Sequence, residues 1–204
     1  MATMTPPRRP AVLNLPNQLT LSRFVLALVL FGLIAGESWA WCVVVFALAA
    51  VTDWLDGYLA RLQNLTSTLG RILDPLVDKV LMCGVYISLL PLGQEQGWLE
   101  PWMVTVVVAR ELVITGLRGY MEQQGARFGA DWLGKFKMGL QCAAVFAIFV
   151  ALLSPAWSPP WTPFFEQVRL GLVYAMVVVT LLSGLQYLAK AALLFRQKVV
   201  RNEF

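Results

Sequence analysis

Long apolar stretches alternate with short polar connections along almost the whole chain. Six runs rich in Leu, Val, Ala and Phe cover residues 18–36, 39–60, 72–92, 101–121, 134–153 and 166–195. A helix needs roughly 20 mostly apolar residues to cross the hydrocarbon core of a bilayer, and each run is of about that length. The pattern therefore predicts an all-α integral membrane protein with six transmembrane helices.

The segment before the first run has helix-start residues, namely Pro16, Asn17 and Thr20. We expect residues 8–16 to lie along the membrane surface as a short interfacial N-terminal segment. A cleaved signal peptide is not expected, because Arg23 interrupts the run and no small-x-small site follows Gly36. No polar linker divides the apolar runs, so residues 1–204 are predicted to form a single membrane domain. The Pro- and Trp-rich stretch 155–163 is expected to be an outer loop at the interface.

The placement of charge predicts how the helices are oriented. Cations gather at both termini and in the connections between runs two and three and between runs four and five, whereas the other connections are acidic or neutral, except for Arg169. By the positive-inside rule, both termini and the cationic connections face the cytoplasm of a multi-pass protein in the inner (cell) membrane. No nucleic-acid partner is expected. The cations that carry this bias are Arg8, Arg9, Arg61, Arg71, Arg127, Lys135, Lys137, Arg196, Lys198 and Arg201.

The amino-acid composition limits the kinds of catalytic and metal site that the chain can form. The chain of 204 residues is 58% hydrophobic and 14% charged, whereas soluble domains carry about 25% charged residues. It contains no histidine, which excludes a Ser-His-Asp triad, a histidine base and a histidine-ligated zinc site. Proton transfer must then fall to Asp, Glu, Lys, Tyr or Cys. The three cysteines lie in separate apolar runs without a motif and are expected to be free thiols.

Four aspartates lie in or beside the second and third runs, where a carboxylate at membrane depth costs several kcal/mol. Asp53 and Asp56 are three residues apart, and Asp74 and Asp78 are four apart, so each pair lies on one side of its helix. The two helices are consecutive and antiparallel, which brings all four carboxylates to the cytoplasmic end. Helix capping accounts for one aspartate per helix end, but not for two on one face.

Such a cluster indicates bound cations, because like charges a few Å apart raise one another's pKa. Oxygen ligands without imidazole or thiolate favour Mg²⁺, Mn²⁺ or Ca²⁺. Two divalent ions would balance the charge and hold phosphate oxygens. Gly57 and Gly70 fit close approach of a ligand, although close helix packing is the alternative interpretation.

Residues 53–78 read Asp53-x2-Asp56-Gly57-x2-Ala60-Arg61-x8-Gly70-x3-Asp74-x3-Asp78. This resembles the signature of the CDP-alcohol phosphotransferase family at every fixed position, and the six-helix topology resembles it too. The resemblance implies that Asp53 and Asp74 bridge two divalent cations, Mg²⁺ or Mn²⁺, and that Asp56 and Asp78 complete the two sites. It also implies that Asp78 is the general base and that the protein is a homodimer. The residues implied to contact the cytidine diphosphate are Gly57, Arg61, Thr66, Ser67, Asn17, Thr20 and Arg23.

In that family an alcohol attacks the β-phosphorus of a CDP-activated lipid, here CDP-diacylglycerol from membrane lipid, and CMP leaves. A second polar group indicates an anionic alcohol, since run 101–121 contains charged residues that can share a helix face and two lysines begin the next run. We expect four of these cations to bind the acceptor's phosphate, although positive-inside anchoring is the alternative, and Glu111 to pair with a cation. The four cations are Arg110, Arg118, Lys135 and Lys137.

The acceptor is suggested by a closer resemblance. Ala109-Arg110-Glu111, Leu117-Arg118, Gly134-Lys135-x-Lys137 and Gln186-Tyr187-Leu188 look like the bacterial phosphatidylglycerophosphate synthase branch, whose acceptor is sn-glycerol 3-phosphate. The match departs at Gly119 and Met138. Phosphatidylglycerol, the acceptor of a cardiolipin synthase, is the nearest enzymatic alternative. An ion-coupled transporter is the alternative outside enzymes, but the carboxylates gather at one end and no internal repeat is visible.

Overall fold

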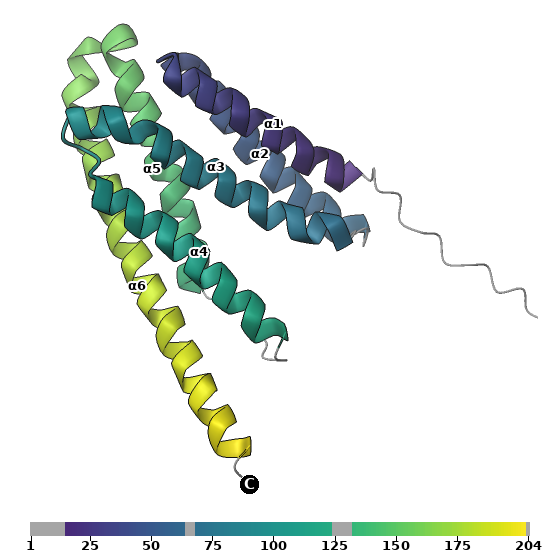
Figure 1. The fold of residues 1–204 in the computed structure, drawn as a ribbon. Coiled ribbons are helices and arrows are strands. Elements are labelled where there is room, and N and C mark those ends of the chain that lie inside the picture. Colours follow the sequence, from purple (N-terminus) through teal and green to yellow (C-terminus); the bar gives the residue numbers. More distant parts are fainter. Residues whose placement is uncertain (1–14, 64–67, 124–131, 203–204) are drawn as a thin grey trace, which may run out of the picture. The chain divides into compact units, whose positions relative to one another are not determined.

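The six apolar runs correspond to six α-helices in the computed structural model, which describes residues 15–63, 68–123 and 132–202 (Figure 1). Side chains are described at residue 18 and over 20–53, 75–121 and 132–193. Within these ranges the chain is helical apart from short turns, and it contains no strand, so the predicted all-α class is confirmed. The interfacial segment predicted over residues 8–16 lies outside the described residues except for its last two, which belong to the first helix.

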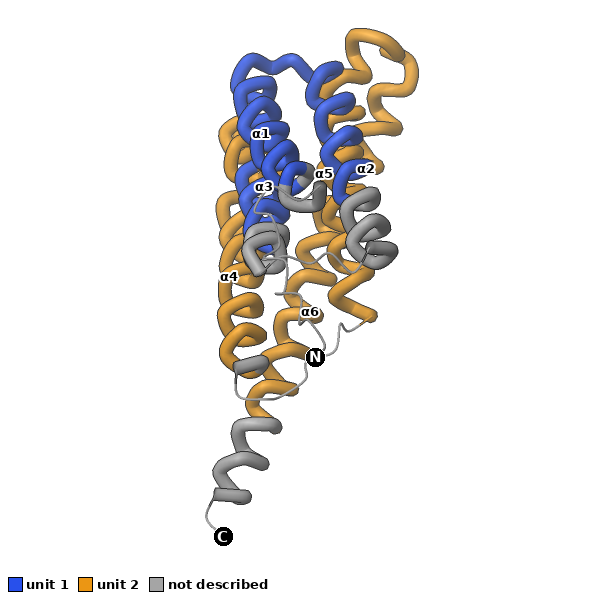
Figure 2. Tube along the Cα trace, turned by 90° about the vertical axis from the view of Figure 1, so that its right-hand side faces the viewer, with its two compact units in different colours: residues 1–84 blue, residues 85–204 orange. Residues whose placement is uncertain are grey.

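The chain divides into two compact units, residues 1–84 and 85–204 (Figure 2). The first unit contains α1 (Leu15–Ala35), α2 (Trp39–Gln63) and α3 (Thr68–Glu95) as far as Gly84. Helices α1 and α2 pack against each other, and small residues such as Ala27, Cys42 and Ala49 are almost completely buried in this unit. Small side chains allow helix backbones to approach closely, which is how helices in a lipid environment gain contact.

A tight turn reverses the chain between α1 and α2. Three backbone hydrogen bonds close it, among them Gly36 N to Gly32 O and Ser38 N to Leu33 O, both at 3.0 Å. Glu37 takes the left-handed conformation with φ 51°, a position that usually holds glycine just past a helix end. The turn makes the two helices antiparallel neighbours, as the sequence predicts.

Helix α3 lies close against α1 at a glycine. A Cβ atom added at Gly84 would stand 2.2 Å from Cζ of Phe31, so the aromatic ring occupies the space that a side chain would need. Glycine therefore sets the distance between these two helices, which carry residues of the predicted site.

The second unit contains the rest of α3, α4 (Pro101–Gln123), α5 (Trp132–Trp157), the short 3₁₀ helix η1 (Pro159–Trp161) and α6 (Thr162–Asn202). Helix α6 packs against both α4 and α5. The core of this unit is formed by side chains that are fully buried, among them Val107, Val145, Ile148, Phe149 and Met176.

The loop predicted over residues 155–163 is largely helical. Pro155 and Trp157 belong to the last turn of α5, and η1 begins at Pro159, so a single residue separates these two helices. Pro155 has no N–H to donate to the carbonyl of Ala151, but Ser154 Oγ donates a hydrogen bond to that oxygen at 2.8 Å. The hydroxyl of a neighbouring serine thus satisfies the carbonyl that proline leaves without its usual donor.

The outer surfaces of the helices are apolar. Large hydrophobic side chains are exposed on every helix, for example Leu112, Trp132 and Leu185 with exposed fractions of 62%, 76% and 63%. Extensive apolar surface of this kind marks contact with lipid or with another protein. In the described part of the chain, three segments are long and apolar enough to cross a membrane: Pro75–Glu95, Trp132–Trp157 and Pro159–Leu193. Shorter apolar helices cover Thr20–Ala35 and Trp39–Asp53, so the predicted count of six spans is not confirmed.

Candidate active site

One buried arginine joins two of the four predicted carboxylates. The Arg23 side chain is only 2% exposed, and its NH1 nitrogen lies 2.7 Å from Oδ1 of Asp53 and 2.5 Å from Oδ1 of Asp78. These residues come from α1, α2 and α3, so three helices of the first unit meet at one guanidinium nitrogen. The expectation that the second and third helices bring their carboxylates together is met for this pair.

The electrostatics of this cluster favour another cation. Two carboxylates converge on one guanidinium, so the three groups carry a net negative charge. The Asp53 and Asp78 side chains are 41% and 28% exposed, which leaves part of each carboxylate open to a ligand. Arg23 is the counter-ion of two predicted metal ligands in the structure, and its predicted contact with the nucleotide stays a prediction. Thr20, one turn earlier on α1, is buried with an exposed fraction of 1%.

Several predicted site residues cannot be placed by their side chains. Helix α2 continues through Asp56, Gly57 and Arg61, and α3 begins at Thr68 and continues through Asp74. Their helical backbone keeps Asp56 on the side of Asp53, and Asp74 on the side of Asp78. The side chains of Asp56, Arg61, Asp74 and Asn17 lie outside the described residues, as do Thr66 and Ser67 altogether.

The donor set is chemically suited to a hard divalent cation. Among the side chains that the structure describes, no group of three or more acidic or sulfur-containing residues could hold a metal ion. The described pair supplies carboxylate oxygens only, and both oxygens already converge on the positively charged nitrogen of Arg23. Oxygen ligands of this type are those that Mg²⁺ and Mn²⁺ prefer.

A second polar cluster lies within the second unit. Glu111 Oε1 on α4 accepts hydrogen bonds from Arg110 NH1 at 3.2 Å and from Lys137 Nζ on α5. The NH2 group of Arg110 donates to Ser183 Oγ on α6 at 2.8 Å. One ion-paired network therefore links α4, α5 and α6, and its members are mostly buried.

Two of the four cations that were predicted to act together meet at one carboxylate. Arg110 and Lys137 meet at Glu111, and their side chains are 13% and 4% exposed. Arg118 and Lys135 are exposed and belong to the solvent- or lipid-facing surface of their helices. The expected pairing of Glu111 with a neighbouring cation is confirmed, and Glu111 in fact pairs with two.

Helix α6 supplies partners that the sequence did not reveal. Ser183 is fully buried, and the guanidinium of Arg110 lies 5.8 Å from the centre of the Tyr187 ring. A Cβ atom at Gly184 would stand 3.4 Å from Cγ of Arg110, so the glycine leaves room for the arginine stem. The sequence analysis pointed to this part of α6 only through Gln186-Tyr187-Leu188, and it gave no sign of Ser183 or Gly184.

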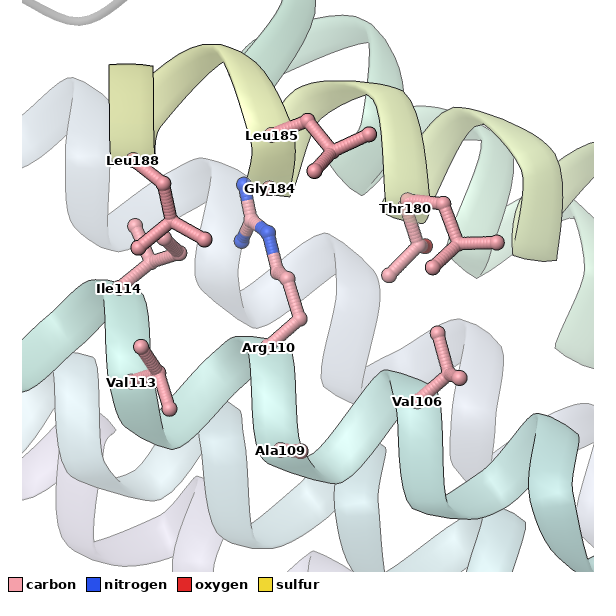
Figure 3. A pocket seen from close by; sticks show the side chains of 10 residues that line it. Val106, Ala109, Arg110, Val113, Ile114, Thr180, Gly184, Leu185 and Leu188 are labelled. Atoms are coloured by element: carbon pink, nitrogen blue, oxygen red, sulfur yellow. The ribbon is translucent and has the colours of Figure 1, made fainter. Parts of the chain in front are cut away.

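A groove between α4 and α6 passes over the same arginine (Figure 3). It has a volume of about 250 Å³, and Val106, Val113 and Leu188 are among its apolar lining residues. Figure 3 shows the Arg110 side chain rising from α4 toward α6 beside Gly184. Arg110 and Thr180 are the lining residues with polar side chains, and the rest of the groove wall is apolar.

Comparison with known proteins identifies the family of the chain. A family model of CDP-alcohol phosphatidyltransferases matches residues 13–182. The chain is 35% identical over 185 residues to the CDP-diacylglycerol–glycerol-3-phosphate 3-phosphatidyltransferases of Escherichia coli (strain K12) and Shigella flexneri serotype 5b (strain 8401). It is 34% identical to that of Salmonella typhimurium, and each match covers 87% of this chain and 94% of the relative. Because the family model matches residues 13–182, which is most of the chain, the chain belongs to the CDP-alcohol phosphatidyltransferase family.

Proposed function

We propose that the protein transfers the phosphatidyl group of CDP-diacylglycerol to sn-glycerol 3-phosphate, giving phosphatidylglycerophosphate and CMP in phospholipid biosynthesis. The relatives that match nearly their full length carry out this reaction according to their names. The observation that carries the proposal is the meeting of Asp53 and Asp78, from two helices, at one buried arginine.

The reaction requires a base and an in-line displacement at phosphorus. The hydroxyl oxygen of the acceptor bonds to the β-phosphorus, the bond from that phosphorus to the CMP oxygen breaks, and CMP leaves with the electron pair. We assign Asp78 as the base that takes the hydroxyl proton, because a carboxylate is suited to this role in a chain without histidine. Arg23 holds Oδ1 of Asp78 and so fixes the orientation of the carboxylate.

The proposed metal ligands are Asp53, Asp56, Asp74 and Asp78. Two bound Mg²⁺ or Mn²⁺ ions would supply neutralisation of the pyrophosphate and stabilisation of the departing CMP. The described part of this set offers only oxygen donors, which supports the assignment. We assign Asn17, Thr20, Arg23, Gly57, Arg61, Thr66 and Ser67 to the nucleotide end of the site.

The acceptor end of the site is assigned to the second cluster. Arg110 and Lys137 are buried cations on two helices, and the phosphate of glycerol 3-phosphate would bring the anion that such cations favour. Arg118 and Lys135 are exposed and would act at longer range, where solvent screens their charge.

We further propose a multi-pass protein of the inner membrane, with six spans, both termini and the active site on the cytoplasmic side, and two copies per functional unit. The described helices include three that can span a bilayer, and α1, α2 and α4 would supply the remaining spans. The distribution of cations supports the orientation.

The test is a transfer assay with purified protein, labelled CDP-diacylglycerol and Mg²⁺, with lipid products separated by chromatography. Glycerol 3-phosphate should give phosphatidylglycerophosphate, and excess EDTA should stop the reaction until Mg²⁺ or Mn²⁺ is returned. Cardiolipin formed from added phosphatidylglycerol, or equal use of uncharged glycerol, would overturn the acceptor assignment. Full turnover in excess EDTA would overturn the metal assignment.

A further inference from the structure

Glu111 is the carboxylate that accepts both ion pairs of the second polar cluster. A single oxygen, Oε1, accepts from cations on two helices, Arg110 of α4 and Lys137 of α5. Its side chain is 12% exposed, so this carboxylate is held away from solvent together with both partners. The three groups together carry one net positive charge, which suits an anionic ligand while keeping the cost of burying charge low.

The remaining contacts of Arg110 leave one direction for a ligand. NH1 is directed to Glu111 and NH2 to Ser183, and the ring of Tyr187 lies beside the guanidinium. Nε is buried and has no hydrogen-bond partner among the described residues. Buried donors in folded proteins are nearly always satisfied, so a donor left over inside an ionic network is available to an anionic ligand or to a water molecule.

A second buried donor without a partner among the described residues lies on α5, one turn after Lys137. Gln141 follows Lys137 by four residues, so both side chains lie on one face of the helix. Gln141 is 2% exposed, and its Nε2 group, which is buried, also lacks a hydrogen-bond partner among the described residues. Each helix that Glu111 joins therefore carries one buried N–H donor without a partner among the described residues, and N–H donors of this kind can bind phosphate oxygens.

We propose that Glu111 is a positioning residue that joins Arg110 and Lys137 into one anion-binding unit, to which Gln141 adds a further donor. This role rests on the proposed function, in which Arg110 and Lys137 bind the phosphate of the acceptor. Glu111 does not touch the acceptor; it sets the distance between the two cations and the direction in which Arg110 Nε points. Without Glu111, both cations keep their charge but lose their common geometry.

The experiment measures the KM of both substrates for Glu111→Gln, with Glu95→Gln as the matched control because Glu95 is exposed at the end of α3. We expect Glu111→Gln to raise the KM for glycerol 3-phosphate about tenfold or more, the effect of one charge-assisted hydrogen bond. The KM for CDP-diacylglycerol should stay within about twofold of the wild-type value, as both should in the control. Equal changes in both KM values, or no change in either, would overturn the proposal.

A double variant in which the charges of Glu111 and Lys137 are exchanged distinguishes a positioning role of Glu111 from a role in stability alone. Glu111→Gln should lower the melting temperature, because it removes the ion pair between α4 and α5. Glu111→Lys combined with Lys137→Glu restores an ion pair between these helices, so the double variant should have a higher melting temperature than Glu111→Gln. It should not recover the acceptor KM, because the cation then stands on the wrong helix; recovery of both would show that Glu111 only stabilises the fold.

Two further variants distinguish failure of this inference from failure of the acceptor site itself. If Arg110→Gln and Lys137→Gln raise the acceptor KM but Glu111→Gln does not, only the positioning role is wrong. If none of the three variants changes the acceptor KM, the assigned acceptor site is wrong and the inference falls with it. Gln141→Leu should also raise the acceptor KM, and an unchanged value would remove Gln141 from the unit.

Discussion

The positive charge of Arg23 stabilises two neighbouring carboxylates in the way that a bound metal ion would. Its NH1 nitrogen is within 2.7 Å of an oxygen from each of two aspartates, and both of those aspartates are proposed metal ligands. A guanidinium and a divalent cation both relieve the repulsion between carboxylates. The arginine therefore lowers the cost of gathering these side chains before any ion binds, and it can share them once an ion is present.

Substitution of Arg23 should make folding depend more strongly on metal. In Arg23→Gln the two carboxylates lose their common cation, and we expect the free energy of unfolding without metal to fall by about 1–2 kcal/mol, discounted for their partial exposure. Added Mg²⁺ should then raise the melting temperature of this variant more than that of the wild type. The control is Arg169→Gln, which removes another buried arginine, stacked at 4.7 Å on Trp98 in the second unit. An equal Mg²⁺-induced rise in Arg23→Gln and in the wild type would contradict this role.

Kinetic measurements should distinguish the proposed role of Asp78 as a base from the role of the other aspartates as metal ligands. Asp78→Asn keeps the size of the side chain but removes the base, so turnover at saturating substrates should fall about 10²–10⁴-fold. Binding of CDP-diacylglycerol, measured directly, should remain near the wild-type value. A variant that binds the nucleotide poorly but turns over normally at saturation would instead identify Asp78 as a metal ligand alone.

At the scale of the helices, the apolar pattern predicted the six α-helices of the described residues, because each apolar run is long enough to form one. The predicted run 101–121 became α4 at Pro101–Gln123, and run 39–60 became α2 at Trp39–Gln63. The prediction was wrong at residues 155–163, which were expected to form a loop but are largely helical. Ser154 supplies the hydrogen bond that Pro155 cannot, and this compensation depends on side-chain geometry that residue type alone does not reveal.

The candidate site was predictable to a similar degree. Fixed spacing along helices placed Asp53 and Asp78 on facing sides of consecutive helices. It could not show that Arg23 of α1 stands between them, since that contact spans 55 residues of sequence. Likewise, charge pattern grouped four cations, whereas packing selected Arg110 and Lys137 and left Arg118 and Lys135 exposed.

Two glycines provide a matched test of helix packing in the first unit. Gly84→Ala places a Cβ within 2.2 Å of the Phe31 ring, which must turn or move away, whereas a Cβ at Gly32 on α1 meets nothing within 4 Å. We expect Gly84→Ala to lower the melting temperature, and Gly32→Ala to leave it unchanged or raise it, because alanine favours a helix by up to about 1 kcal/mol. The pair is compared by thermal unfolding in one detergent. A melting temperature for Gly84→Ala at or above that of Gly32→Ala would show that the ring moves aside without cost.

At the scale of the whole molecule, the distribution of charge and the number of helices together predict the membrane topology. Six spans place both termini on the same side, and the positive-inside rule places that side in the cytoplasm. Both termini and the connections after α2 and after α4 would then share the compartment that contains glycerol 3-phosphate. The connections after α1, α3 and α5 would lie outside, where Arg169 near the start of α6 is the exception to the charge bias. Its guanidinium stacks on the Trp98 ring, which supplies a partner for a cation on the less basic side.

Cysteine labelling in intact cells tests this topology directly. In a background where Cys42, Cys83 and Cys142 are replaced by serine or alanine, Ala156→Cys places an exposed thiol at the end of α5, on the proposed outer side. Ala126→Cys places one in the connection between α4 and α5, on the proposed cytoplasmic side. A membrane-impermeant maleimide should label the first in intact cells and the second only after the membrane is permeabilised. Six spans fix the side of every connection at once. The reverse labelling pattern would therefore mean that the protein has the opposite orientation in the membrane. Labelling of both thiols in intact cells would mean that α5, the helix between the two positions, does not cross the membrane, and the six-span topology would then be wrong.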